Sequence, residues 1–127
     1  TERKAEARTV LITDEAITLT SHRLIVRELI AIILDNALRH SPRKSRVQVD
    51  IKATNHRITV CLTNDGQIAA RDLPHIFERF FSGDQRTGGY GLGLSLAKQL
   101  AGALGGQLTA TSRKGTTTFT ISLPKTL

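Results

Sequence analysis

Hydrophobic and polar positions alternate along two neighbouring stretches of the chain. Within 46–54 and within 57–64, apolar residues occur at every second position. This period predicts two half-buried strands, joined by a hairpin turn at Asn55-His56. Further strands, with a short turn within each pair, are predicted at 9–12 and 16–20 and at 106–112 and 116–124.

Three helices are predicted around these strands. The first runs from about Ser21, a good N-cap, to His40, and a shorter helix covers about 71–77. The third runs from 91 to 104 and ends at a pair of glycines, which is typical of a helix C-terminus. Together the elements predict an α/β fold. It is a two-layer α/β sandwich in which helices cover one face of a mixed, mostly antiparallel sheet.

The length and composition of the chain narrow the class of protein. A chain of 127 residues suits a single domain spanning 1–127. No run approaches ~18 consecutive apolar residues and no signal-peptide pattern opens the chain, so neither a membrane span nor secretion is predicted. Cys61 is the only cysteine, which excludes an internal disulfide. The net charge of +7 would suit nucleic acid, but the basic residues are scattered among few aromatic residues, so we expect no nucleic-acid partner.

The first long helix carries a polar residue on an apolar face. At about 100° per residue, Asn36 shares a face with four apolar residues, Ile25, Leu29, Ile32 and Ile33. A buried amide costs about 1–3 kcal/mol unless its polar atoms find partners. Asn36 is therefore either bonded to a neighbouring carbonyl or available to a ligand, and both interpretations stay open.

A second polar group lies at the end of a predicted strand. The inward-facing positions of 57–64 end at Asn64, which is followed by Asp65-Gly66. These residues are strong turn formers, so a plain turn is one interpretation. The other is that a carboxamide and a carboxylate lie at the mouth of the layer into which Asn36 points.

A glycine-rich segment opens the second long helix. Gly91 and Gly93 fall in its first predicted turn, where free backbone N–H groups let phosphate oxygens approach closely. The polar stretch 82–87 before it has no apolar anchor. It is either a surface loop or a lid that closes over a bound phosphate chain.

Four motifs in this order resemble a known family. They are Asn36 within "ELIAIILDNALRHS", the "NDG" that begins at Asn64, "FERFF" at 77–81 and "GYGLGL" at 89–94. Together they resemble the catalytic and ATP-binding domain of bacterial sensor histidine kinases, within the superfamily that includes gyrase, Hsp90 and MutL. The resemblance covers about Val10 to Pro124 and implies the Bergerat-type ATP-binding fold.

The resemblance implies ATP and Mg²⁺ as cofactors and assigns a role to each motif. Asn36 holds the metal through its side-chain oxygen, Arg39 lies near the phosphates, and these two are the expected catalytic residues. His40 lies beside the adenine, whose amino group is read by the glycine box that begins at Asn64. Thr117 also lies near the adenine. The implied ATP-binding residues are Asn36, Arg39, His40, Asn64, Asp65, Gly66, Ile68, Arg79, Phe80, Arg86, Tyr90, Gly91, Leu92, Gly93, Leu94 and Thr117.

The chain departs from the family pattern at several positions. Ile32 stands where histidine kinases carry a second asparagine and where the ATP-hydrolysing relatives carry a glutamate base. Asn64 stands in place of the adenine-reading aspartate, although its amide oxygen still accepts a hydrogen bond. A second glycine is missing between Gly66 and Ile68, and Gly115 is one residue away from its usual position.

The leading hypothesis for function is a protein-histidine kinase. The domain would bind Mg-ATP and donate the γ-phosphate to a histidine, for relay to a response-regulator receiver domain. None of its four histidines lies in a phosphoacceptor sequence. The acceptor is therefore expected on a dimerisation domain absent from this chain, which begins at Thr1. The resemblance implies the cytoplasmic part of a membrane-bound sensor, joined to the membrane only through missing parts.

Two other functions stay open. The first is a nucleotide-binding module with little or no catalytic activity, because Ile32 and Asn64 depart from the family pattern. The second is an ATPase of the gyrase or MutL type. It has less support, because Ile32 cannot activate water.

Overall fold

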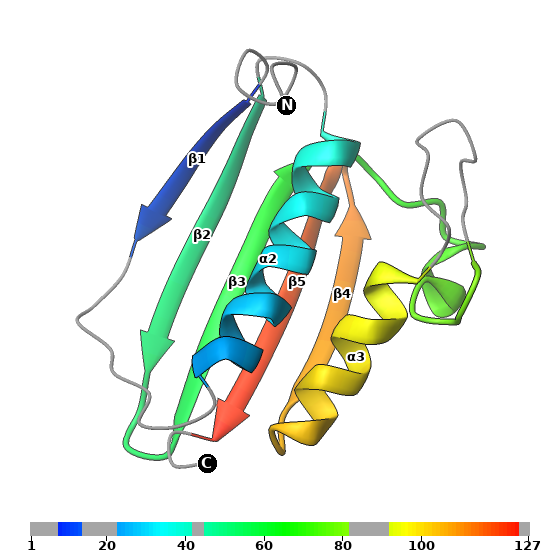
Figure 1. Cartoon of the computed structure of the whole chain (residues 1–127). Helices are drawn as coiled ribbons and strands as arrows, with labels where there is room; N and C mark the ends of the chain where they lie inside the picture. Colours follow the sequence, from blue (N-terminus) through cyan, green and yellow to red (C-terminus); the bar gives the residue numbers. More distant parts are fainter. Residues whose placement is uncertain (1–7, 14–22, 42–44, 82–91, 125–127) are drawn as a thin grey trace.

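The computed structural model describes residues 8–13, 23–41, 45–81 and 92–124, and shows one five-stranded sheet in that part of the chain (Figure 1). The strand order is β1-β2-β3-β5-β4. β1 pairs with β2 in parallel, and the other neighbouring pairs are antiparallel. The mixed, mostly antiparallel sheet predicted from the sequence is confirmed. The strands are β1 (Arg8–Thr13), β2 (Ser45–Ala53), β3 (Arg57–Asp65), β4 (Gln107–Arg113) and β5 (Thr116–Pro124).

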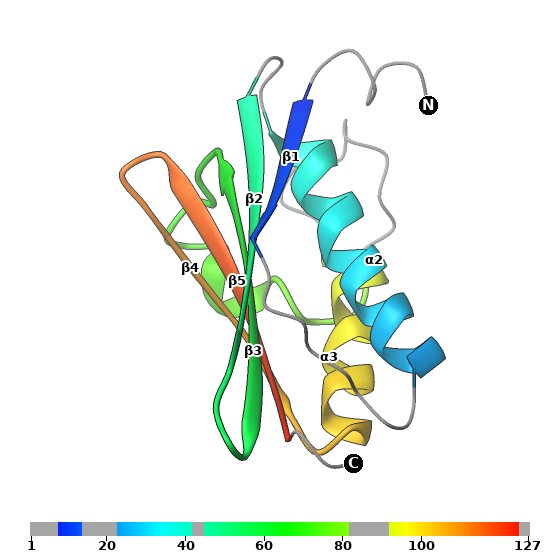
Figure 2. The ribbon, with the colours of Figure 1, turned by 90° about the vertical axis from the view of Figure 1, so that its left-hand side faces the viewer.

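Both long helices pack on the same face of the sheet. They are α2 (Arg23–His40) and α3 (Gly93–Ala103), and Figure 2 shows them together on one side of the strands. Within the described ranges, no element covers the other face of the sheet (Figure 2). The predicted two-layer sandwich is therefore confirmed. Separately, no helix among the described residues is long and apolar enough to cross a membrane.

Some helix boundaries differ from the sequence-based expectation. α3 begins at Gly93 rather than at residue 91, because Leu92 is the N-cap and its carbonyl accepts the hydrogen bond from the Leu96 N–H at 3.0 Å. The expected helix at 71–77 is reduced to the single 3₁₀ turn η1 (Leu73–His75). The predicted strand at 16–20 and the polar stretch 82–87 lie outside the described residues.

The core fills the layer between the helices and the sheet. Leu29, Ile33 and Ala37 are fully buried, and their four-residue spacing directs one face of α2 onto the strands. Leu62 of β3 and Phe119 of β5 are also buried, and they face each other in the strand register. Apolar positions alternate along the strands, so every second side chain joins this core.

A row of polar residues crosses the inner face of the sheet at one end of the core. Asn64 of β3 lies opposite Thr117 of β5, and Thr117 lies opposite Ser112 of β4. We call Asn64, Thr117 and Ser112 the polar row. Phe119 occupies the adjacent inner position on β5 and is buried in the core. The polar row therefore lies where the apolar layer ends.

Candidate functional site

Asn64 presents a buried polar atom without a partner. The residue is 4% exposed, and its Nδ2 donates a hydrogen bond to the Asp65 carbonyl at 2.9 Å. Its Oδ1 is buried and accepts no hydrogen bond from any described residue. Turning the amide over would place this oxygen against the Asp65 carbonyl, so the bond fixes its orientation. An unpaired buried acceptor costs about 1–3 kcal/mol, and a ligand with an N–H donor would remove that cost.

The rest of the polar row forms a hydrogen-bonded chain. The Ile68 N–H donates to Ser112 Oγ at 2.7 Å. Ser112 Oγ and Thr117 Oγ1 are 2.8 Å apart, and the Thr117 hydroxyl donates to the Gly66 carbonyl at 2.8 Å. The hydroxyls of two strands thus hold both ends of the turn that follows β3.

This turn also contacts the β4–β5 hairpin and α2. The Gly66 N–H donates to the Gly115 carbonyl at 2.8 Å, and the Gly115 N–H donates to Gln67 Oε1 at 2.8 Å. Gly66 has a φ of 126°, which an L-residue with a side chain rarely adopts. A Cβ at Gly66 would lie 3.1 Å from the His40 carbonyl oxygen. The turn therefore lies close against the end of α2, where His40 is exposed.

Asn36 lies on α2 midway between two residues, Ile32 and His40, that each approach another part of the site. His40, one turn further along, faces Gly66, and Ile32, one turn earlier, lies 3.6 Å from the place of a Cβ on Gly93. Asn36 is half-buried, and no hydrogen bond joins its side chain to another described residue. Four residues span about 6 Å of helix, so the amide lies between the turn after β3 and the start of α3.

Arg39 forms a surface ion pair beside Asn36. Its Nη2 lies 2.9 Å from Oδ2 of Asp35, with the two side chains 41% and 38% exposed. The two residues form an (i, i+4) pair on α2. At this exposure the pair contributes little to stability. The Arg39 guanidinium could therefore bind a phosphate and lose only the weak ion pair with Asp35.

The aromatic motif 77–81 divides between core and surface. Phe77 packs edge-on against Phe119, with ring centroids 6.3 Å apart. Phe80 is 68% exposed and has a φ of 66°, and the Arg79 guanidinium lies 5.0 Å from the centre of its ring. Arg79 and Phe80 thus form an exposed pair beside α3, separate from the polar row.

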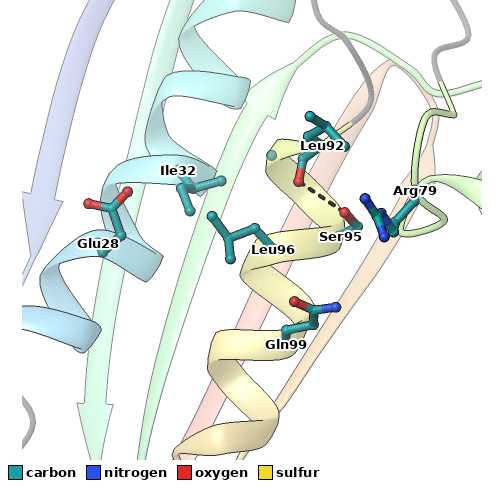
Figure 3. A pocket seen from close by; sticks show the side chains of 8 residues that line it. Glu28, Ile32, Arg79, Leu92, Ser95, Leu96 and Gln99 are labelled. Atoms are coloured by element: carbon teal, nitrogen blue, oxygen red, sulfur yellow. Dashed lines mark hydrogen bonds between the residues drawn. The ribbon is translucent and has the colours of Figure 1, made fainter.

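A groove of about 410 Å³ runs between α2 and α3 (Figure 3). Ile32 and Leu96 extend toward one another across it, and Arg79 lies on the far side of α3 near Ser95. Ile32 places only carbon atoms here, so this position offers no oxygen ligand. Among the described residues, no group of three or more His, Cys, Asp or Glu side chains is placed to hold a metal. The lining residues are Glu28, Ile32, Arg79, Leu92, Gly93, Ser95, Leu96 and Gln99.

The start of α3 provides backbone donors next to this groove. The N–H groups of Gly93, Leu94 and Ser95 precede the first α-helical hydrogen bond, as at every helix N-terminus. Leu94 packs partly against the core, whereas Leu92 is 43% exposed. Arg86, Tyr90 and Gly91, the remaining site residues predicted from the sequence, lie outside the described residues.

The structure brings most of the predicted base-binding residues together. Asn64, Asp65, Gly66, Ile68 and Thr117 belong to one turn and its hydrogen-bonded supports. Sequence reasoning missed Ser112, which joins the turn to the sheet. The alternation along β4 does predict Ser112 on the inner face, but only the strand register shows that it lies opposite Thr117.

The sequence matches a protein family and is similar to curated relatives. Residues 21–127 match the family described as "Histidine kinase-, DNA gyrase B-, and HSP90-like ATPase". The sensor-like histidine kinase SenX3 of Mycobacterium tuberculosis is 39% identical over 101 residues, which cover 75% of this chain and 25% of that protein. The sensor protein CiaH of Streptococcus pneumoniae is 33% identical over 102 residues, which cover 76% and 23%. The chain spans about a quarter of the length of these relatives.

Solved structures share the fold. The mycobacterial sensor histidine kinase MprB has a TM-score of 0.79 at 26% identity, with 97% of this chain and 84% of that chain covered. Full-length ShkA, solved in complex with AMPPNP, also has a TM-score of 0.79, with 97% and 26% covered. Its identity is 21%, so this second likeness shows the fold alone. The family and fold predicted from the four motifs are confirmed.

Proposed function

Because the chain belongs to the histidine kinase-, DNA gyrase B- and HSP90-like ATPase family, we propose that it binds Mg-ATP and donates the γ-phosphate to a histidine of a sensor kinase. The observation that carries this proposal is the buried, unpartnered Oδ1 of Asn64 at the edge of the core layer. Such an acceptor favours a ligand with an N–H donor. The 6-amino group of adenine is a donor of this kind.

The turn after β3 would hold the base. Asn64 accepts a hydrogen bond from the amino group, and the buried Thr117 lies beside it in the same row. Gly66 lets the turn lie close to the end of α2, because a Cβ there would come within 3.1 Å of the His40 carbonyl oxygen. The partly buried Ile68 and the exposed His40 supply flanking contacts.

The other half of the site would hold the phosphates and the metal. Asn36 offers the amide oxygen that a hard cation such as Mg²⁺ prefers, and phosphate oxygens and water would complete the ligand set. Bound there, Mg²⁺ would neutralise charge on the phosphates. The N–H groups at Gly93 and the cationic Arg39 attract the same phosphates. Arg79, on the far side of α3, remains a proposed phosphate contact.

The histidine that accepts the phosphoryl group belongs to another domain in this proposal. His40 would lie beside the base, and His56 lies in the β2–β3 turn. His75 is held by Glu78, with Nδ1 2.8 Å from Oε2. An in-line approach to the γ-phosphate needs a group outside these positions. We therefore propose a dimerisation domain as acceptor, a receiver domain as next partner, and a cytoplasmic location.

Radiolabelled ATP tests the transfer. The chain is incubated with labelled ATP and Mg²⁺, alone and together with an acceptor-histidine dimerisation domain from the same full-length protein. We expect acid-labile label on the added domain only. Label on the isolated chain would overturn the assignment of the acceptor to another domain.

A pair of variants tests the metal site. Asn36→Ala should remove Mg²⁺-dependent ATP binding in calorimetry while leaving the thermal midpoint nearly unchanged, because the amide makes no hydrogen bond to a described residue. Asn55→Ala, in the exposed β2–β3 turn, is the matched control and should bind as the parent does. Equal affinity in both variants would return Asn36 to a packing role.

A second function, nucleotide binding with little catalysis, is favoured by the position of Ile32, whose side chain lies 3.6 Å from the place of a Cβ on Gly93. An isoleucine at this point can neither bind metal nor activate water. The two functions differ in the labelling experiment. ATP binding without any transfer to the supplied acceptor would favour the second.

A further inference from the structure

The hydroxyls of the polar row have a defined hydrogen-bond direction. Thr117 carries one hydroxyl hydrogen, and it is donated to the Gly66 carbonyl, which can only accept. The 2.8 Å contact between Ser112 and Thr117 therefore requires Ser112 to be the donor. Ser112 in turn accepts from the Ile68 N–H. The chain runs in one direction, from the Ile68 N–H through both hydroxyls to the Gly66 carbonyl.

This direction determines which polar atoms remain for a ligand. The hydrogens of Ser112 and Thr117 are both used inside the row, so Thr117 keeps only a lone pair. Asn64 lies opposite Thr117, and its orientation leaves a buried oxygen that has no partner in the part of the chain that the structure describes. The two adjacent residues of the site thus offer hydrogen-bond acceptors and no hydroxyl donor.

Ser112 also supports the turn where the sequence has lost a glycine. Only Gln67 separates Gly66 from Ile68, and the hydroxyl chain connects these two flanking residues. Without Ser112, the Ile68 N–H loses its acceptor and Thr117 loses the donor that fixes its hydroxyl. Thr117 would then be held by the Gly66 carbonyl alone, so its hydroxyl would turn toward a ligand more readily.

We propose that Ser112 is a positioning residue that keeps the base pocket an acceptor, so that it selects 6-amino purine nucleotides over 6-oxo purine nucleotides. The proposal rests on the proposed nucleotide-binding function and deepens it. A 6-amino group donates to Asn64 Oδ1, whereas a 6-oxo group brings a second acceptor against it. Sites built to hydrogen-bond one group reject the analogue that lacks it.

The test compares ADP with inosine diphosphate in the presence of Mg²⁺. Calorimetric titration of the parent chain should show that ADP binds about tenfold or more tightly than inosine diphosphate. A tenfold ratio of affinities corresponds to about the free energy of one hydrogen bond. Ser112→Ala should weaken ADP about tenfold and inosine diphosphate much less, so that the preference falls. Ser112→Thr retains the hydroxyl and should restore most of it. Thr111→Ala, on the exposed face of the same strand, is the matched control.

The ratio of the two affinities separates positioning from a general structural role. If Ser112→Ala weakens both nucleotides equally or leaves both unchanged, the proposal is wrong. Thr117→Val keeps the side-chain shape but frees the Ser112 hydroxyl as a donor, so it should also lower the preference for ADP. This variant tests the proposal even if Ser112→Ala fails to fold. A parent chain that binds neither nucleotide overturns the proposed function itself.

Discussion

The buried side-chain oxygen of Asn64 has opposite effects on ligand binding and on the stability of the free domain. Its Oδ1 is buried without a partner among the described residues, which is unfavourable by about 1–3 kcal/mol. A ligand N–H would remove that penalty on binding. The residue therefore weakens the free domain in the same place where it would strengthen the complex.

Replacing Asn64 with leucine should separate these two effects. Asn64→Leu removes the unpaired oxygen and keeps a similar volume, while the exposed Asp65 can bond its freed carbonyl to water. We expect the free energy of unfolding without nucleotide to stay equal or to rise by up to about 1 kcal/mol. ADP binding should be lost. Urea denaturation and calorimetry measure the two quantities. A clear loss of stability in the free variant would mean that the oxygen has a partner outside the described residues.

Two polar residues of the site could be found from the sequence because they interrupt an apolar pattern. Asn36 and Asn64 each occur where an apolar pattern predicts a buried side chain, so both could be singled out from the chain alone. Ser112 also falls on an inward-facing position of its strand, but a serine near the end of a strand is common and does not stand out. Its importance depends on the β4–β5 register, which joins it to Thr117. Such pairings are long-range and cannot be read from local periodicity.

At the scale of elements, α3 is fastened to the edge of the sheet by Lys98. Its Nζ donates a hydrogen bond to the Leu108 carbonyl on β4 at 3.1 Å and lies 4.8 Å from the centre of the Phe77 ring. Phe77 packs in turn against Phe119 of the core. One side chain thus connects the helix, the edge strand and the aromatic motif 77–81.

Lys98→Met should therefore destabilise the domain by about 1–2 kcal/mol, from a charge-assisted hydrogen bond and a cation–π contact. Lys98→Arg should recover part of that loss. Lys52→Met changes an exposed lysine on β2 and should stay within about 0.5 kcal/mol of the parent. Thermal unfolding of the three variants makes the comparison. Equal effects at positions 98 and 52 would mean that the Lys98 contacts contribute nothing specific.

Two glycines near the end of α3 should respond to alanine in opposite ways. Gly102 is exposed within the helix, and a Cβ there meets no heavy atom within 4 Å. Gly102→Ala should stabilise the domain by about 0.5–1 kcal/mol, because alanine loses less backbone entropy in a helix. At Gly106 a Cβ would collide with the Ser122 carbonyl and lie 2.7 Å from Leu123 Cδ2. Gly106→Ala should destabilise it, and a gain in unfolding temperature there would contradict the packing described.

Helix positions were predicted better than helix starts. The first long helix was expected from about residue 21 and is observed over Arg23–His40, since its apolar face is long and regular. The second starts at Gly93, and its N-cap Leu92 makes no side-chain hydrogen bond that would have marked the start in the sequence. The expected 71–77 helix forms only a 3₁₀ turn, with Pro74 unable to donate a backbone hydrogen bond.

At the scale of the whole molecule, the sequence predicted the two layers but not the order of the strands. Alternation along each strand assigns one face to the core, which is enough for a sandwich. The place of β5 between β3 and β4 depends on pairings between distant parts of the chain, such as Leu62 with Phe119. Local patterns do not encode such pairings. The hairpin predicted at 106–124 does not by itself show which other strand pairs with it.

A truncated chain tests the importance of that central strand. A chain that ends at Gly115 keeps both long helices and four of the five strands but lacks β5, which pairs with both β3 and β4. We expect no cooperative unfolding transition, because the edges of β3 and β4 lose their partner and the core loses Phe119, Ile121 and Leu123. Circular dichroism during heating would show it. A cooperative transition in the truncated chain would contradict a central role for β5.

The same strand order has a consequence for how the domain is made. A ribosome produces β5 after every other element, yet this strand fills the middle of the sheet. Until Pro124 has left the exit tunnel, the nascent polypeptide exposes apolar strand faces and open edges, which are the features that aggregate. We therefore expect the described sheet to close only after β5 has been translated.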